Sequence, residues 1–189
     1  CHRRFIGNSI FSAYRREAEF LVEDGASPQE IDAAMEEFGM AMGPFAVFDM
    51  AGLEIAWARR KRQAATRDPS ERYVDIADRL CEAGRFGQKT GRGWYRYDGG
   101  KREVDPDVEA LIEQSRAAKG ITPRTISRNE IIAWLLQAMV NEGKRLLDDG
   151  VAARASDIDL VMINGYGFPA HKGGPMYQAQ LATGSDRIS

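Results

Sequence analysis

Residues that could carry out metal or thiol chemistry are scarce in this chain of 189 residues. His2 and His171 are the only histidines, which leaves too few imidazole ligands for a typical protein metal site. The two cysteines, Cys1 and Cys81, form no CxxC pair and no disulfide framework, a pattern that favours a reducing compartment. The sequence therefore predicts no metal centre and no structural disulfide.

Two glycine-containing segments resemble nucleotide-binding motifs without meeting their requirements. Gly87-Gln88-Lys89-Thr90 looks like the end of a P-loop, but in that motif a glycine directly precedes the lysine and another lies five positions earlier. The segment 165–170 fits the spelling GxGxxG/A, yet a capped helix precedes it where a dinucleotide fingerprint needs a strand. We therefore expect no cofactor-binding loop in this chain.

The elements that must position any site are predicted to be helices, because start and stop signals alternate at helix-length intervals. Capping residues predict helix starts at Ser27, Asp68, Asp105, Ser127 and Ser156. Glycines that follow helical runs predict helix ends at Gly25, Gly84, Gly120 and Gly150. The fold class that these signals indicate is all-α.

Hydrophobic periodicity agrees with a helical chain. One helical face carries Ile6, Ile10, Tyr14, Ala18 and Leu21, which predicts an amphipathic first helix. The segment 45–57 is apolar around its whole circumference and predicts one buried central helix, followed by the basic run 59–62 as a solvated helix end. The segment 87–100 is the one plausible break from helix, an ordered loop with room for a short extended piece.

A weak internal repeat organises these elements. Each copy reads as a long helix, a glycine stop, a capped second helix with an Ile-Asp pair, and a Gly-Pro turn into a third helix. Ile31-Asp32 and Gly43-Pro44 in the first copy correspond to Ile158-Asp159 and Gly174-Pro175 in the second. We interpret the two copies as a duplicated helical domain, although a helix, a glycine and a capped helix are also common separately.

Composition narrows the possible classes of protein. Hydrophobic residues make up 43% and charged residues 29% of the chain, and the formal net charge is −2, a balance expected of a soluble globular protein. Lys and Arg are not clustered as they would be in a nucleic-acid-binding protein. The sequence also has no apolar run of about 18 residues, the length that a membrane span requires. Both ends of the sequence look cut, so we expect a fragment of a longer protein.

Five motifs in this order give the chain a family resemblance that covers residues 1 to about 182. They are Phe5-Ile6-Gly7-Asn8, Met42-Gly43-Pro44-Phe45, Asp49 to Leu53, Gly87 to Tyr95, and Gly167-Phe168-Pro169 with Gly173-Gly174-Pro175. Together they resemble the C-terminal domains of 3-hydroxyacyl-CoA dehydrogenases, in the duplicated form of multifunctional fatty-acid β-oxidation enzymes that also carry an enoyl-CoA hydratase. The implied fold is two tandem helical domains, similar to the C-terminal domain of 6-phosphogluconate dehydrogenase.

The resemblance implies a division of the chain and of the chemistry. We predict a first helical domain at 1–98, a linker with one helix at 99–124, and a second, truncated repeat at 125–189. The family transfers a hydride between NAD and the 3-hydroxy carbon of an acyl-CoA, and its Rossmann domain supplies both the NAD site and a His–Glu catalytic pair. That domain would precede Cys1, so neither catalytic residue is expected here, and the segment alone should be inactive.

Partners and location follow from the same resemblance. The implied partners are an acyl-CoA substrate, the Rossmann domain of the same protein and, as an option, a second copy in a homodimer. A non-catalytic helical docking module and the helical domain of another hydroxy-acid dehydrogenase are the alternatives. We prefer a cytoplasmic location, with a peroxisomal one as the alternative.

Asn8 is the one candidate site residue. As a residue type it suits a helix cap, and without the family pattern that role comes first; with the family pattern the site role comes first. The family's asparagine in the Phe-Ile-x-Asn motif lies near the catalytic histidine and the substrate oxygen, and it maps onto Asn8; a neutral amide can donate there without competing for the proton. The sequence departs from the family at Arg4 and Ser9, where Gly and Arg are usual.

Other polar and apolar residues have simpler interpretations. Lys89 could contact a CoA phosphate, but a loop-stabilising role is favoured, and His171 lies in a turn motif and is not a substitute base. Glu17 and Glu142 are expected at the surface rather than as buried anchors. Four methionines could line an acyl tunnel, although core packing is favoured; they are Met35, Met40, Met42 and Met50.

Overall fold

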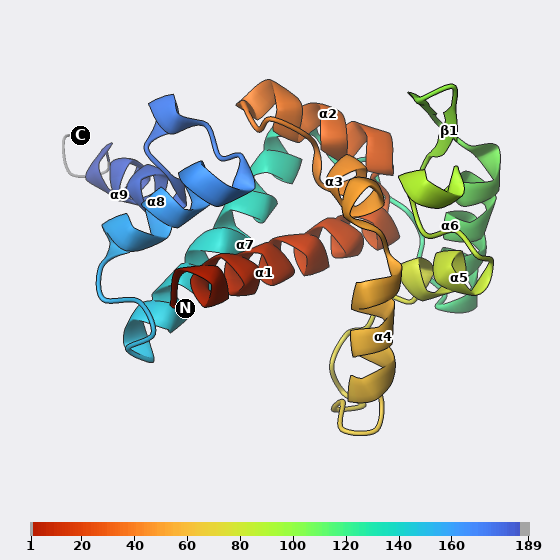
Figure 1. The fold of residues 1–189 in the computed structure, drawn as a ribbon, viewed down its shortest axis with the longest axis horizontal. Helices are drawn as coiled ribbons and strands as arrows, with labels where there is room; N and C mark the ends of the chain where they lie inside the picture. The colour runs from red at the N-terminus through yellow and green to blue at the C-terminus, as the bar shows by residue number, and fades with distance from the viewer. Residues whose placement is uncertain (1, 186–189) are drawn as a thin grey trace. The chain divides into compact units, whose positions relative to one another are not determined.

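A computed structural model of the chain describes residues 2–185 (Figure 1). The side chains of residues 3–184 are described as well. The α-helices are α1 (His2–Asp24), α2 (Pro28–Phe38), α3 (Pro44–Ala51), α4 (Glu54–Gln63), α5 (Ile76–Glu82), α6 (Pro106–Ala118), α7 (Arg128–Asp148), α8 (Ala155–Tyr166) and α9 (Pro175–Ser185). Two 3₁₀ turns, η1 (Gln88–Thr90) and η2 (Ala170–Lys172), and two strands, β1 (Arg96–Asp98) and β2 (Lys101–Glu103), complete the described elements. The predicted all-α class is confirmed, with one small hairpin added.

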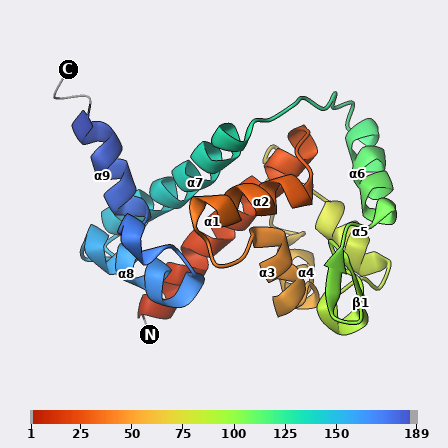
Figure 2. The same ribbon diagram turned by 90° about the horizontal axis from the view of Figure 1, so that it is seen from above.

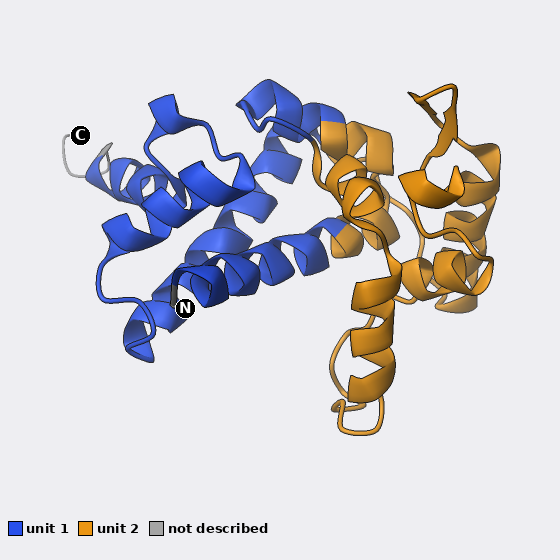
Figure 3. Cartoon of the chain, viewed as in Figure 1, with its two compact units in different colours: residues 1–18, 33–42, 127–189 blue, residues 19–32, 43–126 orange. Residues whose placement is uncertain are grey.

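The chain separates into two compact units (Figure 3). Unit 1 comprises residues 1–18, 33–42 and 127–189, and unit 2 comprises residues 19–32 and 43–126. These units are assigned by spatial contact, whereas the predicted boundaries at 98/99 and 124/125 divide the chain by its repeat. The sequence-based boundaries therefore remain a prediction about duplicated segments.

Three of the five predicted helix caps form as expected. Ser27 and Ser127 each accept a hydrogen bond from the backbone N–H three residues later, on Glu30 and Glu130, at 3.2 Å. Asp105 accepts from the N–H of Asp107 at 3.0 Å and precedes the first-turn proline of α6. These caps are local in sequence, which explains why residue type alone identified them.

Two other predicted starts are wrong. Asp68 accepts hydrogen bonds from the N–H and hydroxyl of Ser70, at 2.9 and 2.7 Å, and this closes a turn instead of a helix. The next helix, α5, begins at Ile76. In the second case α8 begins at Ala155, so Ser156 lies inside the helix and its N-cap residue is Arg154. An Asp or Ser side chain satisfies nearby N–H groups in turns as readily as at helix ends.

The predicted single buried helix over 45–57 is also wrong. Gly52 adopts φ 92° and ends α3, and the N–H of Leu53 donates to the carbonyl of Phe86 at 3.0 Å before α4 starts. α3 is largely buried, whereas no residue of α4 is buried and Ile55 is 72% exposed. The apolar pattern was continuous, but the backbone breaks it into one core helix and one surface helix.

The loop predicted over 87–100 contains the expected extended piece, which is β1. It pairs with β2 in an antiparallel hairpin, with Arg96 opposite Glu103 and Asp98 opposite Lys101 (Figure 2). The second strand lies beyond the predicted segment. Its residues, Lys101 to Glu103, are charged and carry no apolar alternation by which sequence could identify a strand.

Each unit has its own apolar core. In unit 2 the rings of Phe45, Phe48 and Trp94 form edge-to-face pairs, with centroids 5.4 Å apart for Phe45–Phe48 and 4.6 Å apart for Phe45–Trp94. In unit 1 the buried stripe of α7 includes Ile131, Leu135 and Met139, and α8 and α9 pack against this helix. The predicted face of α1 is buried at all of its positions: Ile6, Ile10, Tyr14, Ala18 and Leu21.

The two copies of the repeat share an aspartate cap that joins their second and third helices. Asp32 of α2 accepts from the N–H groups of Phe45 and Ala46, at 2.8 and 3.0 Å, at the start of α3. Asp159 of α8 accepts from the N–H groups of Met176 and Tyr177, at 2.8 and 3.2 Å, at the start of α9. Corresponding residues thus make the same contact, which supports the interpretation of a duplication.

The glycine of each Gly-Pro turn is required by this cap. A Cβ on Gly43 would lie 2.4 Å from Asp32, and one on Gly174 would lie 2.4 Å from Asp159. Only glycine lets the chain pass this close to the capping carboxylate.

Within the described residues, no helix has both the length and the apolar character needed to cross a membrane.

Candidate functional site

Asn8 is an exposed residue of α1 and lies within the first two turns of this helix. Because α1 begins at His2, Asn8 is not its N-cap residue, and the capping role is wrong. Its neighbours Ile6 and Gly7 are buried, whereas Asn8 itself is exposed. Asparagine is a weak helix former, so helix propensity does not explain its presence at this position.

The carboxamide of Asn8 is held by Tyr166, the last residue of α8. The Tyr166 hydroxyl donates to Asn8 Oδ1 at 2.7 Å. The ring of Tyr166 lies against α1, since a Cβ on Gly7 would meet Tyr166 Cε2 at 2.1 Å, and its centroid is 5.6 Å from that of Phe11. Gly7 therefore has a structural purpose that the sequence did not reveal, which is to let the tyrosine ring approach the helix.

A cavity of about 400 Å³ lies beside this contact. It is lined by Arg3 and Arg4 of α1 and by a face of α8 that includes Leu160, Asn164 and Tyr166. Tyr166 thus both lines the cavity and bonds Asn8. The lining combines the charges of the two arginines and of Asp157 with the amide of Asn164 and an exposed leucine, so it offers both polar and apolar contacts to a ligand.

The two departures from the family pattern both have contacts in unit 1. Arg4 lines the cavity, and the Ser9 hydroxyl donates to Glu142 Oε1 of α7. Glu142 also binds Arg145, and these two partners hold the pKa of the Glu142 carboxyl below its ordinary value, with Arg145 as the larger cause. The Glu142 side chain is only 14% exposed, so it anchors α7 to α1 and is not the surface residue that we expected.

The glycine-rich segment 87–95 is organised by a buried carboxylate and not by a phosphate. Asp49 accepts from the N–H groups of Trp94 and Tyr95, at 2.9 and 3.1 Å, and from the Tyr97 hydroxyl at 2.7 Å. A Cβ on Gly93 would lie 2.2 Å from Asp49 Oδ1, and one on Gly87 would lie 2.2 Å from the Asp49 carbonyl oxygen. Burial raises the pKa of Asp49. The family motif in this segment is therefore structural.

Other residues considered from sequence also have structural partners. Lys89 forms an ion pair with Glu54, which fits the favoured loop-stabilising role. Met35 and Met40 are buried in the core, whereas Met50 is 56% exposed. His171 is an exposed residue of η2, and the free thiol of Cys81 is buried, where burial raises its pKa to about 11. Cys1 lies outside the described residues.

The Gly-Phe-Pro motif closes the end of α8. Gly167 takes a left-handed conformation with φ 74° as the C-cap, and its carbonyl accepts from the N–H of Ala41. The Phe168 ring meets that of Phe38 edge to face at 5.7 Å. Helix α8, and not a strand, leads directly into this GxGxxG-like segment, which differs from the strand–glycine–helix arrangement of a dinucleotide site.

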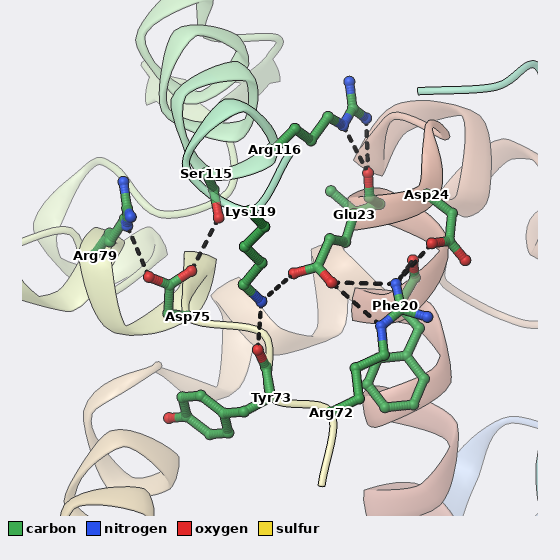
Figure 4. A network of polar contacts seen from close by, with 11 residues as sticks. Phe20, Glu23, Asp24, Arg72, Tyr73, Asp75, Arg79, Ser115, Arg116 and Lys119 are labelled. Atoms are coloured by element: carbon green, nitrogen blue, oxygen red, sulfur yellow. Dashed lines mark hydrogen bonds and ion pairs between the residues drawn. The ribbon is translucent and has the colours of Figure 1, made fainter. Parts of the chain in front are cut away.

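Unit 2 contains a polar cluster around Glu23, which the sequence did not predict (Figure 4). Glu23 is only 1% exposed, and its two oxygens bind Arg72 at 3.2 Å and Lys119 at 2.6 Å. Arg116 donates to the carbonyl of Val22 at 2.6 Å, next to Glu23 in α1. Figure 4 shows these cations converging on the end of α1 from α6 and from the segment before α5. Since the carboxylate is paired with two cations, the cluster ties the end of α1 to α6 and to the segment before α5, and it offers no free reactive group.

Among the described residues, no group of three or more His, Cys, Asp or Glu side chains could hold a metal ion. Asn8 with Tyr166 and the adjoining cavity therefore remains the candidate site. The sequence identified Asn8 through the family motif. It could not identify Tyr166, which lies 158 residues away in the chain.

Comparison with known proteins gives the chain a family. Residues 5–97 match the family described as the 3-hydroxyacyl-CoA dehydrogenase C-terminal domain. The chain is 45% identical to the peroxisomal bifunctional enzyme of Pongo abelii over 93% of its length and 26% of the relative's. It is 36% identical to the peroxisomal fatty acid beta-oxidation multifunctional protein of Oryza sativa subsp. japonica, covering 93% of the chain and 25% of the relative.

A solved structure supports the same assignment. The dehydrogenase part of multifunctional enzyme 1 from C. elegans matches with a TM-score of 0.72 and 29% identity, over 92% of this chain and 39% of that one. The chain thus spans about a quarter of the length of the curated relatives that it matches. Residues 5–97 therefore belong to the family of 3-hydroxyacyl-CoA dehydrogenase C-terminal domains, and the chain as a whole is similar to multifunctional enzymes that contain such domains.

Proposed function

We propose that this chain is the helical part of an NAD-dependent 3-hydroxyacyl-CoA dehydrogenase of fatty-acid β-oxidation, in which it forms one wall of the acyl cleft. Its family and the names of its relatives support this assignment. The observation that carries it is the exposed carboxamide of Asn8, which stands in the Phe-Ile-x-Asn motif beside a cavity and is bonded through Oδ1 to Tyr166.

Asn8 supplies a hydrogen-bond donor to the oxygen on carbon 3 of the substrate. Because Oδ1 accepts from Tyr166, the amide nitrogen is the part of the side chain that remains for a ligand. Oxidation of the alcohol converts this oxygen into a carbonyl, and the reverse reaction develops negative charge on it. A fixed neutral donor stabilises that charge without competing for the hydroxyl proton, which a base outside this chain removes.

NAD does not fit the residues described here. The only segment with a fingerprint-like spelling, 165–170, follows helix α8 and lacks the required strand. In our proposal the NAD site and the His–Glu pair belong to a Rossmann domain of the same protein. The helical segment contributes binding and orientation of the acyl-CoA, and on its own it is inactive.

We also propose that the Rossmann domain is the main protein partner and that the protein acts in the peroxisome. The names of the relatives support the peroxisomal alternative and give no support to the cytoplasmic location that we preferred from sequence. Phe5, Trp134 and Leu160 of unit 1 are exposed apolar residues suited to a covered surface. A homodimer is a second possible cover for them.

The first test is an activity assay of the full-length enzyme that carries this segment. Oxidation of NADH with acetoacetyl-CoA is followed for the wild type, Asn8→Ala and Asn8→Asp. Loss of one fixed donor to a developing charge is expected to lower kcat about a hundredfold. Asn8→Asp should lose at least as much, because a carboxylate accepts hydrogen bonds and repels the developing charge.

Asn141→Ala is the matched control, since Asn141 is an exposed asparagine of α7 that accepts a hydrogen bond from Gln137 at 2.7 Å. Its activity should equal that of the wild type. If Asn8→Ala keeps full activity, the site assignment fails. If the wild type does not turn over acyl-CoA substrates of any length, the proposed reaction itself fails.

A further inference from the structure

The contact between Asn8 and Tyr166 joins the start of the first copy of the repeat to the end of the second helix of the other copy. Both residues belong to unit 1, and the hydroxyl-to-Oδ1 distance is 2.7 Å. A carboxamide has two orientations that exchange its oxygen and nitrogen, and the two differ only in hydrogen bonding. An exposed asparagine without a fixed partner would present either group to a ligand.

Three features of unit 1 hold the Tyr166 hydroxyl in place. Gly7 leaves no Cβ where the ring lies, and Phe11 packs against the ring at a centroid distance of 5.6 Å. The carbonyl of the next residue, Gly167, is bonded to the N–H of Ala41, which fixes the backbone after the tyrosine. The hydroxyl is therefore presented by a packed ring and a bonded backbone, and not by a mobile side chain.

The electrostatic surroundings favour the hydroxyl as a donor towards Asn8. Burial raises the pKa of Tyr166, so its proton stays bound at neutral pH, while the positive charge of Arg4 acts in the opposite direction. A cation near a hydroxyl attracts its oxygen and directs its hydrogen away. Arg4, which stands where the family usually has glycine, adds a positive charge to these surroundings. The direction of donation, towards Asn8 Oδ1, is given by the 2.7 Å hydrogen bond itself.

We propose that Tyr166 is a positioning residue that fixes the carboxamide of Asn8 with its N–H donors towards the substrate oxygen. This inference rests on the proposed function of Asn8. It assigns to the second copy of the repeat a part in the reaction, through one hydroxyl, in addition to its packing.

A double-mutant cycle in the full-length enzyme tests the proposal, with Tyr166→Phe, Asn8→Ala and the double variant. Tyr166→Phe keeps the ring and removes the hydroxyl. It is expected to lower kcat about fivefold to tenfold, the effect of one neutral hydrogen bond, with little change in KM. The double variant should be no slower than Asn8→Ala alone, because Tyr166 acts only through Asn8.

Tyr177→Phe is the matched control, because Tyr177 is a half-exposed tyrosine of α9 in the same unit. It should keep wild-type kcat, and the thermal midpoints of all variants should stay within a few degrees. If Tyr166→Phe is silent while Asn8→Ala is slow, the positioning role is refuted and the proposed function stands. An equal loss from Tyr166→Phe in both backgrounds refutes it as well. If Asn8→Ala is silent, both proposals fail.

Gly7→Ala provides an independent test from the opposite side of the contact. Its Cβ would meet the Tyr166 ring at 2.1 Å, so the ring must move and its hydroxyl must leave Asn8. The variant should reproduce the loss of kcat seen in Tyr166→Phe, although alanine favours helix more than glycine does. Gly184→Ala of α9 is the control, because a Cβ added at Gly184 would meet no other part of the described chain within 4 Å, and this variant should stay fully active. Wild-type activity in Gly7→Ala would contradict the proposal.

Discussion

The two copies of the repeat use the same capping aspartate in different surroundings. Asp32 is 2% exposed and has three donors, the N–H groups of Phe45 and Ala46 and the Tyr95 hydroxyl at 2.7 Å. Asp159 is 8% exposed, and its hydrogen bonds come from the N–H groups of Met176 and Tyr177. The difference is that the first copy adds a side-chain donor to a backbone cap.

That added donor comes from the segment that follows the first copy. Tyr95 belongs to the glycine-rich loop whose backbone is bound by Asp49, and its hydroxyl reaches Asp32 from there. The cap itself needs only an aspartate, a Gly-Pro turn and a helix N-terminus, which both copies have. A duplicated segment can therefore keep its cap while one copy gains a second layer of hydrogen bonds around it.

The largest effect is expected from Asp32→Ala. The change leaves two N–H groups and one hydroxyl without their acceptor in a buried site, and each such group costs about 1–3 kcal/mol. We expect the free energy of unfolding of this chain to fall by about 4 kcal/mol in urea titrations. Asp107→Ala, at an exposed aspartate in the first turn of α6, should cost less than about 1 kcal/mol.

A smaller effect is expected from Asp159→Ala. Only two backbone donors lose their acceptor, and the site is less buried. The expected loss is about 2 kcal/mol, the upper range for a helix N-cap, measured by the same titration. The comparison between the copies would be broken if this loss equalled or exceeded that of Asp32→Ala.

The smallest effect is a dependence on pH. Burial raises the pKa of Asp32 from 3.8 to about 6, against the opposing hydrogen bonds from Tyr95, Phe45 and Ala46. The folded state therefore takes up a proton near pH 6 that the unfolded chain takes up only near pH 4. The stability linked to this group is fully present below about pH 4 and is lost as the pH rises through about 6.

The measurement compares wild type with Asp32→Asn at pH 5 and pH 7. On going from pH 7 to pH 5, the unfolding free energy of the wild type should rise by about 1 kcal/mol relative to the variant, which has no proton to bind. Using the difference between the two proteins removes the contributions of other carboxylates, including Asp49 and Asp159, whose pKa values burial also raises. A relative change of zero, or of opposite sign, would show that Asp32 stays ionised in the fold.

Features that depend on neighbours in sequence were predicted from the sequence itself. The caps at Ser27, Asp105 and Ser127, the buried face of α1 and the corresponding positions of the repeat all follow from residue type and spacing. A cap is completed within three residues and a helical face within four, so the physics that decides them is local. The family motif then added Asn8, which no local rule singles out.

Tertiary contacts decided the remainder. The break after Gly52, the partly buried Glu142 and the paired Glu23 depend on groups that are distant along the chain. Tyr166 and Gly7 form a pair 159 residues apart, and neither has a periodicity or a cap that would reveal the other. The sequence alone therefore determined the helical class, three of the helix caps and the candidate asparagine. Packing decided where α3 ends and which hydroxyl holds the amide, because those choices depend on which groups folding brings within hydrogen-bond distance.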